Sequence, residues 1–154
     1  MSNTHTRQSE IGLSSIESEV FIAATRYSDQ ILAEKNQLLS IRGMTVLQHN
    51  ALRILYVHDP DGTGLSGGDI GKYLYTRVPD LTRLLDRLAD KGWLIRERDE
   101  NNRRVVRSRL TEIGIELVES VHTSLKAQEK KQMDHLEEKD KLELKRLLGL
   151  ALKQ

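Results

Sequence analysis

The 154-residue chain contains no cysteine, only two prolines, and one residue each of tryptophan and phenylalanine. Without cysteine it can form no disulfide, no zinc site with thiolate ligands and no thiol redox centre, and nothing marks an oxidising compartment. It also lacks the run of about 20 apolar residues that a membrane span requires. The N-terminal sequence MSNTHTRQSEIG has no apolar segment behind a basic start. We therefore expect a cytoplasmic protein that makes no contact with a membrane.

Charge is abundant in this chain and unevenly distributed. The formal net charge is only +1, yet residues 72–109 hold 11 Lys or Arg against 6 Asp or Glu, net +5. The rest of the chain holds 13 against 17, net −4. Phosphates attract lysine and arginine, so such a basic segment is typical of a nucleic-acid contact. The alternative is a solvated face with compensating acids, and charge alone leaves both possibilities open.

Helical periodicity dominates the chain, and 38% of its residues are hydrophobic, which is enough for a real core in one domain. A capping box at residues 14–17 predicts a long helix that runs to about Leu39 and is broken by Gly43. A second capping box at residues 45–48 predicts a helix that ends near His58.

Residues 76–93, TRVPDLTRLLDRLADKGW, include one of the two prolines. Proline suits the first turn of a helix because its missing N–H has no intrahelical acceptor there, and Asp80 complements the positive end of the helix dipole. We therefore predict that Pro79 starts a helix that Gly92 ends. The leucines of this helix share one stripe that faces the core, and Arg83 lies on the opposite side.

A short helix capped by Ser66 and Asp69 precedes this one, and a linker of about four residues around 75–78 completes a helix-turn-helix pattern. In that motif the second helix enters the major groove of DNA. Segments 94–98 and 104–110, separated by the turn-forming sequence DENNR, predict a basic β-hairpin. An arginine near the tip of such a wing fits the narrow minor groove.

Two further helices are predicted after the hairpin, the first opened by Thr111. Their apolar faces, together with that of the first helix, suggest an intersubunit bundle and a homodimer. The predicted fold class is mainly α with a small β-hairpin wing, a winged helix-turn-helix flanked by N- and C-terminal dimerisation helices. Within one structural domain, residues 1–42 form the N-terminal dimerisation helix, 43–112 the DNA-binding lobe and 113–154 the C-terminal dimerisation helices.

Two segments carry a family resemblance. TRLLDRLADKGW (82–93) resembles the recognition helix and following turn of the MarR family of transcription regulators, and RERDENNRRVVRSRLTEIG (96–114) resembles its wing. The resemblance covers nearly the whole chain. It implies a repressor-like homodimer that binds an inverted repeat in double-stranded DNA, with no enzymatic activity and no cofactor. Asn102 stands where the family usually has an aspartate that can brace the wing, and Arg77 occupies a position that is acidic in some members.

The family pattern implies DNA contacts from Thr82 and Arg83, with Arg87 nearby, and from the wing arginines, of which Arg104 best matches the tip position. The predicted DNA-binding residues are Arg77, Pro79, Asp80, Thr82, Arg83, Arg87, Arg103, Arg104 and Arg107.

The resemblance further implies that some members release DNA on binding small aromatic acids at the junction of the dimerisation helices and the DNA-binding lobe. Helix placement makes Tyr27, His49 and Arg53 the candidate ligand-binding residues here. The simpler interpretation, which we favour, makes Tyr27 a core residue and the other two surface residues. A ligand site requires converging polar groups, and a sequence cannot show convergence.

Two other patterns suggest different functions. GTGLSG (62–67) has the spacing G-x-G-x-x-G, with Asp86 at a suitable distance for a ribose contact in a dinucleotide-binding enzyme. The helical segment before it argues against that interpretation, because a dinucleotide site follows a strand. His58, Asp59 and Asp61 lack metal-site spacing and are better explained as solvated loop residues. A module that binds something other than DNA is the remaining alternative.

Overall fold

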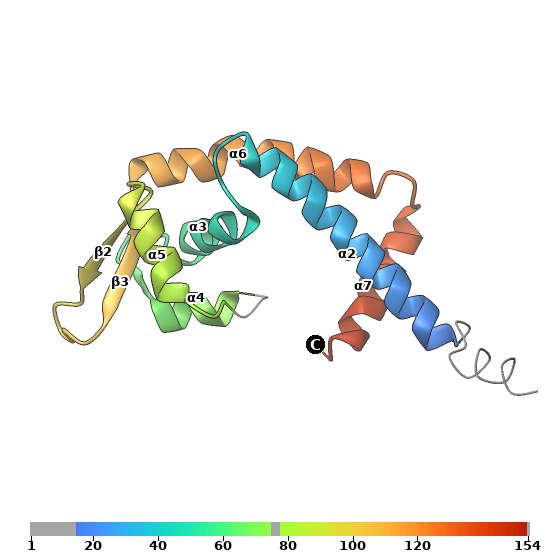
Figure 1. The fold of residues 1–154 in the computed structure, drawn as a ribbon, viewed down its shortest axis with the longest axis horizontal. Coiled ribbons are helices and arrows are strands. Elements are labelled where there is room, and N and C mark those ends of the chain that lie inside the picture. The colour runs from blue at the N-terminus through green and yellow to red at the C-terminus, as the bar shows by residue number, and fades with distance from the viewer. Residues whose placement is uncertain (1–14, 75–77, 154) are drawn as a thin grey trace, which may run out of the picture.

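The computed structural model describes residues 15–74 and 78–153. It is mostly helical with a small antiparallel sheet of strand order β1-β3-β2 (Figure 1), and the predicted winged helix-turn-helix fold class is confirmed. In the described part of the chain, no helix is long and apolar enough to cross a membrane. The elements in chain order are α2 (Ile16–Ser40), α3 (Val46–His58), β1 (Leu65–Ser66), α4 (Gly67–Tyr73), α5 (Leu81–Asp90), β2 (Leu94–Arg98), β3 (Val106–Leu110), α6 (Glu112–Gln132) and α7 (Glu138–Ala151).

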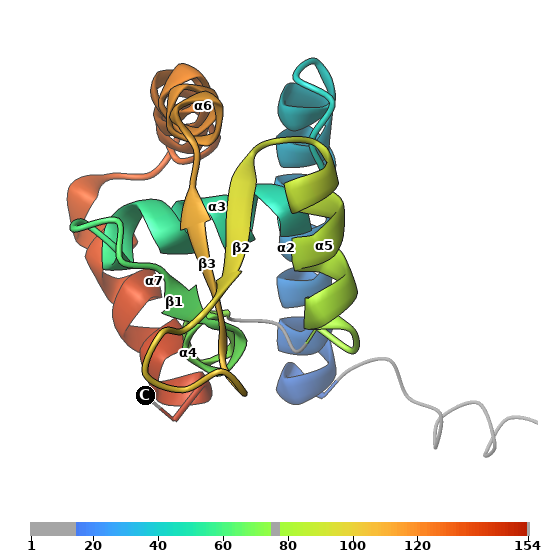
Figure 2. The ribbon, with the colours of Figure 1, turned by 90° about the vertical axis from the view of Figure 1, so that its left-hand side faces the viewer.

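The molecule consists of a lobe and a helical extension. Helices α3, α4 and α5 gather with the sheet in the lobe, and α2, α6 and α7 extend away from it (Figure 1). Helices α2 and α7 overlap in that view but lie on opposite sides of the molecule in Figure 2. No residue of α7 is buried in the single chain.

The starts of the first two described helices test the capping predictions. Helix α2 is capped by Ser15, whose hydroxyl accepts the N–H of Ser18 at 3.2 Å, so the capping box predicted at 14–17 is wrong by one residue. Serine repeats at this point, and the extended backbone of the second serine decides which one caps the helix. The capping box of Thr45 and Gln48 is confirmed, with bonds of 3.2 and 3.0 Å.

The start of α5 also differs from the prediction. Asp80 is the N-cap, and its carboxylate accepts the N–H of Arg83 at 3.0 Å, so the helix begins at Leu81 and Pro79 lies in the preceding turn. An aspartate side chain satisfies a free N–H of the first turn best from the N-cap position, and this bond fixes the start. Gly92 ends the helix with φ +71°, as predicted. The linker residues 75–77, which include Arg77, lie outside the described residues.

Strand β1 was not predicted. Its two residues pair antiparallel with Ser108 and Arg107 of β3, and β3 itself begins at Val106, two residues later than predicted. Gly64, immediately before β1, has φ +86°, and a Cβ there would lie 3.0 Å from the Cβ of Arg107. The stretch GTGLSG therefore forms a turn and an antiparallel edge strand, which is not the parallel βαβ unit that a dinucleotide site requires.

The core lies where the lobe meets α6. The leucine stripe of α5 contributes Leu84, Leu85 and Leu88, all buried, against apolar side chains of α3, α4, β2 and α6. Thr111 fixes the start of α6, because its hydroxyl donates to the carbonyl of Gly92 at 2.7 Å and accepts the N–H of Gly114 at 3.1 Å. The turn that ends α5 is thereby joined to the helix that leaves the lobe.

Candidate nucleic-acid interface

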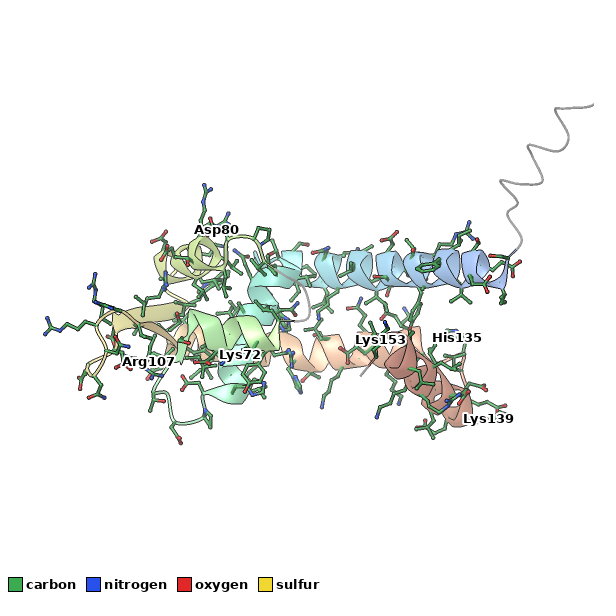
Figure 3. All side chains as sticks on the ribbon, turned by 90° about the horizontal axis from the view of Figure 1, so that it is seen from below. Lys72, Asp80, Arg107, His135, Lys139 and Lys153 are labelled. Carbon is green, nitrogen blue, oxygen red and sulfur yellow. The ribbon has the colours of Figure 1, made fainter. Side chains whose placement is uncertain are left out.

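The outer face of α5 carries polar and basic side chains over a buried leucine stripe. Thr82, Arg83 and Arg87 are exposed, while the leucines on the other side of the helix are buried. The guanidinium of Arg87 donates from Nε to the carbonyl of Arg83 at 3.3 Å, which holds it along the helix. Asp80 caps this helix and lies at its exposed end (Figure 3), with Pro79 exposed beside it.

The wing is the hairpin between β2 and β3, and its loop carries Arg103 and Arg104, both exposed. Asp99 organises this loop by accepting the backbone N–H groups of Asn101 and Asn102 at 2.9 and 2.8 Å. The amide oxygen of Asn102 accepts the N–H of Arg104 at 3.2 Å. Asn102 thus holds the backbone of the tip without a charge, and the charged brace of the wing is Asp99.

Arg107 lies in a different environment from the tip arginines, near the loop end of β3, where it is opposite Glu97 of β2 and pairs with Ser66 of β1 (Figure 3). Its Nε is paired with the carboxylate of Asp99, and its Nη1 donates to the carbonyl of Gly64 at 2.9 Å. The hydrogen bond from Arg107 is the main reason that the pKa of Asp99 is lowered, followed by the N–H of Asn102. A DNA contact from Arg107 stays a prediction; the structure shows it holding the wing to the loop before β1.

Sequence reasoning missed a link between the recognition helix and the wing. The side chain of Arg96 on β2, only 16% exposed, forms an ion pair with Asp86 of α5 and donates to the carbonyl of Thr82 at 3.5 Å. The pair joins the exposed face of the helix to the strand that leads into the wing. In the sequence, Asp86 and Arg96 are only an acidic and a basic residue in two separate elements. No local pattern in either segment indicates that they form an ion pair.

The three candidate ligand-binding residues do not all come together. His49 is buried and Arg53 half-buried, and both line a cavity of about 250 Å³ where α2, α3 and α6 meet. Tyr27 is half-buried on α2, outside the buried core and outside the lining of this cavity. The interpretation that we favoured, with Tyr27 in the core and His49 on the surface, is therefore wrong for both residues. The remaining lining residues are Lys35, Val118, His122, Leu125, Lys126 and Glu129.

A second cavity of about 360 Å³ adjoins the first and shares three lining residues with it, Arg53, Val118 and His122. Its other walls are Tyr56, Val57 and Glu119, and the Tyr56 hydroxyl donates to the Glu119 carboxylate at 2.9 Å. Together the two cavities have the size of a small-molecule site, with a cationic end and a more apolar end.

The geometry defines a winged helix-turn-helix protein, with a recognition helix and wing on one lobe and an extension of long helices. Comparisons with known proteins agree with this class. Residues 42–105 match the model of the MarR family. A MarR transcription factor from Planctomyces limnophilus is 32% identical in sequence with a TM-score of 0.68, over 89% of this chain and 98% of that one. No curated protein matches the chain in sequence.

Two further solved structures share the fold. MepR from S. aureus, solved as a MepR–DNA complex, is 28% identical with a TM-score of 0.78, over 91% of this chain and 98% of that one. AbsC from Streptomyces coelicolor, a MarR family transcriptional regulator, is 20% identical with a TM-score of 0.80, over 92% and 95% of the two chains. The chain described here belongs to the MarR family, whose members are transcription regulators and not enzymes.

Proposed function

We propose that this protein is a homodimeric transcription repressor that binds an inverted-repeat operator in double-stranded DNA and releases it when a small ligand binds. The observation that carries the proposal is the pair of exposed basic surfaces on one lobe, the outer face of α5 and the tip of the wing. Two such surfaces suit the major groove and the adjacent minor groove. The DNA-bound structure of the relative MepR supports it.

Different residues have different proposed roles in DNA binding. Thr82 and Arg83 contact base edges in the major groove, because they lie on the exposed face of the helix near its start. Arg103 and Arg104 enter the minor groove, where a narrow width concentrates negative potential. The other residues of the proposed DNA-binding set contact the phosphate backbone of the DNA or position the residues that contact it. They are Arg77, Pro79, Asp80, Arg87 and Arg107.

Dimerisation is proposed from the apolar side chains that the single chain leaves exposed on its extension. Val20 and Phe21 on α2 are 59% and 74% exposed, and Leu147 and Leu150 on α7 are 49% and 63% exposed. Exposed apolar side chains on long helices are typical of a helical interface between subunits. We accordingly keep residues 1–42 and 113–154 as dimerisation segments and 43–112 as the DNA-binding lobe.

The proposed ligand is a small organic anion. Lys35, Arg53 and Lys126 line one cavity, and Tyr56 and Val57 line the adjoining one. The carboxylate group of such a ligand therefore contacts the cations of the first cavity. The apolar part of the ligand is removed from water in the adjoining cavity. The site lies between the lobe and the extension, so a ligand that binds one arrangement of these parts better than another shifts the population of the DNA-binding form.

Selection of binding sites from random DNA tests the DNA part of the proposal. We expect an enriched inverted repeat with half-sites about one helical turn apart, and an affinity that falls steeply with salt concentration. Weak binding that is independent of sequence would contradict the proposal. A module with a partner other than DNA would show no steep salt dependence of any residual DNA affinity.

Repression is tested by placing the selected operator between a promoter and a reporter gene. Expression should fall when the protein is present and recover when the operator half-sites are scrambled. Increased expression from the intact operator would make the protein an activator and overturn the assignment.

A further inference from the structure

The cavity between α2, α3 and α6 is lined by more cationic than anionic side chains. Lys35 comes from α2, Arg53 from α3 and Lys126 from α6, and Glu129 is the single acid of the lining. Within residues 15–74 and 78–153, none of these four side chains makes a hydrogen bond or an ion pair. Burial lowers the pKa of Lys35, against the opposing effect of Glu129.

His49 forms part of the wall of this cavity. It is only 3% exposed, and its Nδ1 is buried without a hydrogen-bond partner. An orphaned ring nitrogen at the side of a cationic cavity is unusual, because buried polar atoms in proteins are nearly always paired. The charged and titratable groups that face it are Lys35 from α2, Arg53 from α3, and His122, Lys126 and Glu129 from α6, with Asn50 as its polar neighbour on α3.

This environment keeps the imidazole neutral while the cavity is empty of anions. The pKa of His49 is lowered to about 4, chiefly by burial and then by the charge of Lys35, and a side-chain hydrogen bond with Asn50 opposes the shift. A negative charge beside the ring would oppose both of these causes. An anion in the cavity would stabilise the imidazolium by Coulomb attraction and would provide an acceptor for a proton on Nδ1.

We propose that an organic anion binds in this cavity together with one proton, which His49 takes up, so that the protein binds its ligand more tightly as the pH falls. The inference rests on the proposed ligand-controlled function and adds its regulation. The anion carries an apolar body, because the adjoining cavity is lined by Tyr56, Val57 and Val118. The recognised chemistry is therefore a small aromatic or aliphatic carboxylate, and the site senses its concentration and the proton concentration together.

The direction of the pH effect follows from linkage. Above about pH 5 the free protein carries no proton on His49, whereas the complex carries one until the pH exceeds the raised pKa of the bound state. Between those two pKa values the complex holds one proton more than the free protein. The affinity should then fall as the pH rises, by up to about tenfold per pH unit.

Benzoate is a suitable probe, and a pH-stat measures proton uptake directly. The full-length protein in dilute sodium chloride at about pH 6 is titrated with sodium benzoate at the same pH, and the acid needed to hold the pH constant gives the protons taken up per bound benzoate. Calorimetry at several pH values gives the affinity. We expect an uptake close to one proton and weaker binding at higher pH. Benzamide, which has the same shape without the charge, should bind weakly and take up no proton.

Three substitutions assign the proton. His49→Gln should abolish the uptake and flatten the pH dependence of benzoate affinity. His122→Gln and Glu129→Gln are matched controls, because these two residues also line the cavity; both variants should keep the uptake. An NMR titration of the His49 ring in the unmutated protein should show a higher pKa with benzoate bound, and this measurement does not depend on how the variants fold.

The outcomes separate the inference from the function on which it rests. Benzoate binding without proton uptake, or with the same uptake in His49→Gln, overturns the coupling to His49 and leaves the ligand site standing. No benzoate binding between about pH 5 and 7.5 overturns both the coupling and the proposed anion site. Neither result touches DNA recognition, which the operator selection decides independently.

Discussion

The arginines of the basic segment differ in what their guanidinium groups already contact. Arg96 and Arg107 are paired with carboxylates. In the described part of the chain, the side chains of Arg83 and Arg104 make no hydrogen bond and no ion pair, and both are exposed. A free guanidinium on the outer face of a helix can pair bidentately with guanine, whereas one on a wing responds to backbone charge and groove width.

Substitution of these two arginines should therefore have different consequences. Arg83→Ala should relax the preference at one base position and cost about 1 to 3 kcal/mol of operator binding. Arg104→Ala should weaken binding to the operator and to unrelated DNA by similar factors, with a shallower salt slope. The measurement is the affinity of each variant for both DNAs at two salt concentrations.

Arg26→Ala, which removes an exposed cation of α2 outside the proposed DNA-binding lobe of residues 43–112, is the matched control and should leave both affinities unchanged. If Arg104→Ala changes base preference and Arg83→Ala does not, the assigned roles of helix and wing are reversed.

At the scale of elements, the ion pair of Arg96 and Asp86 links α5 to the strand that leads into the wing. Removal of the Asp86 charge by Asp86→Asn would raise DNA affinity if only Coulomb repulsion mattered. We expect the opposite, a loss of operator affinity, because helix and wing must contact the same DNA at once. Arg96→Met should cause a similar loss, and the double variant should be little weaker than either single one, with a coupling of about 0.5 to 3 kcal/mol.

Asp90→Asn provides the control for this double-mutant cycle. Asp90 is exposed on the same helix and makes no ion pair among the described residues, so its replacement removes the same charge without breaking the link. Operator affinity should stay equal or rise. Additive losses in the double variant would show that the pair does not position the wing.

The wing itself is an element whose form depends on a few side chains. Asp99 gathers two backbone N–H groups and Arg107, and Arg107 reaches the carbonyl of Gly64 in a loop far away in sequence. The hydrogen bond from Arg107 lowers the pKa of Asp99. The carboxylate is therefore charged at any pH above the ordinary aspartate pKa, and it loses its charge only when the pH falls below that value. The wing should accordingly keep its form throughout the pH range of the benzoate experiment.

At the scale of the whole molecule, the extension of α2, α6 and α7 leaves large apolar side chains exposed in the single chain. Helix α7 buries none of its residues within one chain, although it carries several leucines. Leu125 is part of the core at 7% exposure, so a deletion that begins there would damage the lobe as well as the extension. A deletion that tests dimerisation without damage to the core should therefore begin after the end of α6 at Gln132.

The proposed dimer should become a monomer on deletion of residues 137–154, which removes the apolar side chains of α7. The double substitution Leu147→Glu with Leu150→Glu should have the same effect, because its charges would be buried in the proposed interface without partners. Sedimentation gives the oligomeric state, and the monomer should lose tight binding to the two half-sites of the operator. Lys145→Glu is the control, since it lies on the opposite side of α7 from these leucines. A well-folded dimer after the deletion would contradict the assigned interface.

The amino-acid sequence by itself determined the helices, the hairpin and which face of the recognition helix is buried. These features depend on neighbours a few residues apart: the leucines of α5 recur at helical spacing, and Thr45 with Gln48 caps α3. Gly92 supplies the positive φ that ends α5. Because leucine and arginine alternate around this one helix, the sequence also predicted which side of it is buried.

Only the tertiary structure decided which residues of the lobe act together. Strand β1 forms because its two residues pair with a strand that lies about 40 positions later in the chain. The pairs Arg96–Asp86 and Arg107–Gly64 join elements that are separate in sequence, and no local pattern predicts either pair. The same holds for His49. Its place on α3 was predictable, but its burial depends on α2 and α6 packing over that side of the helix, and burial beside cations is what keeps its imidazole neutral.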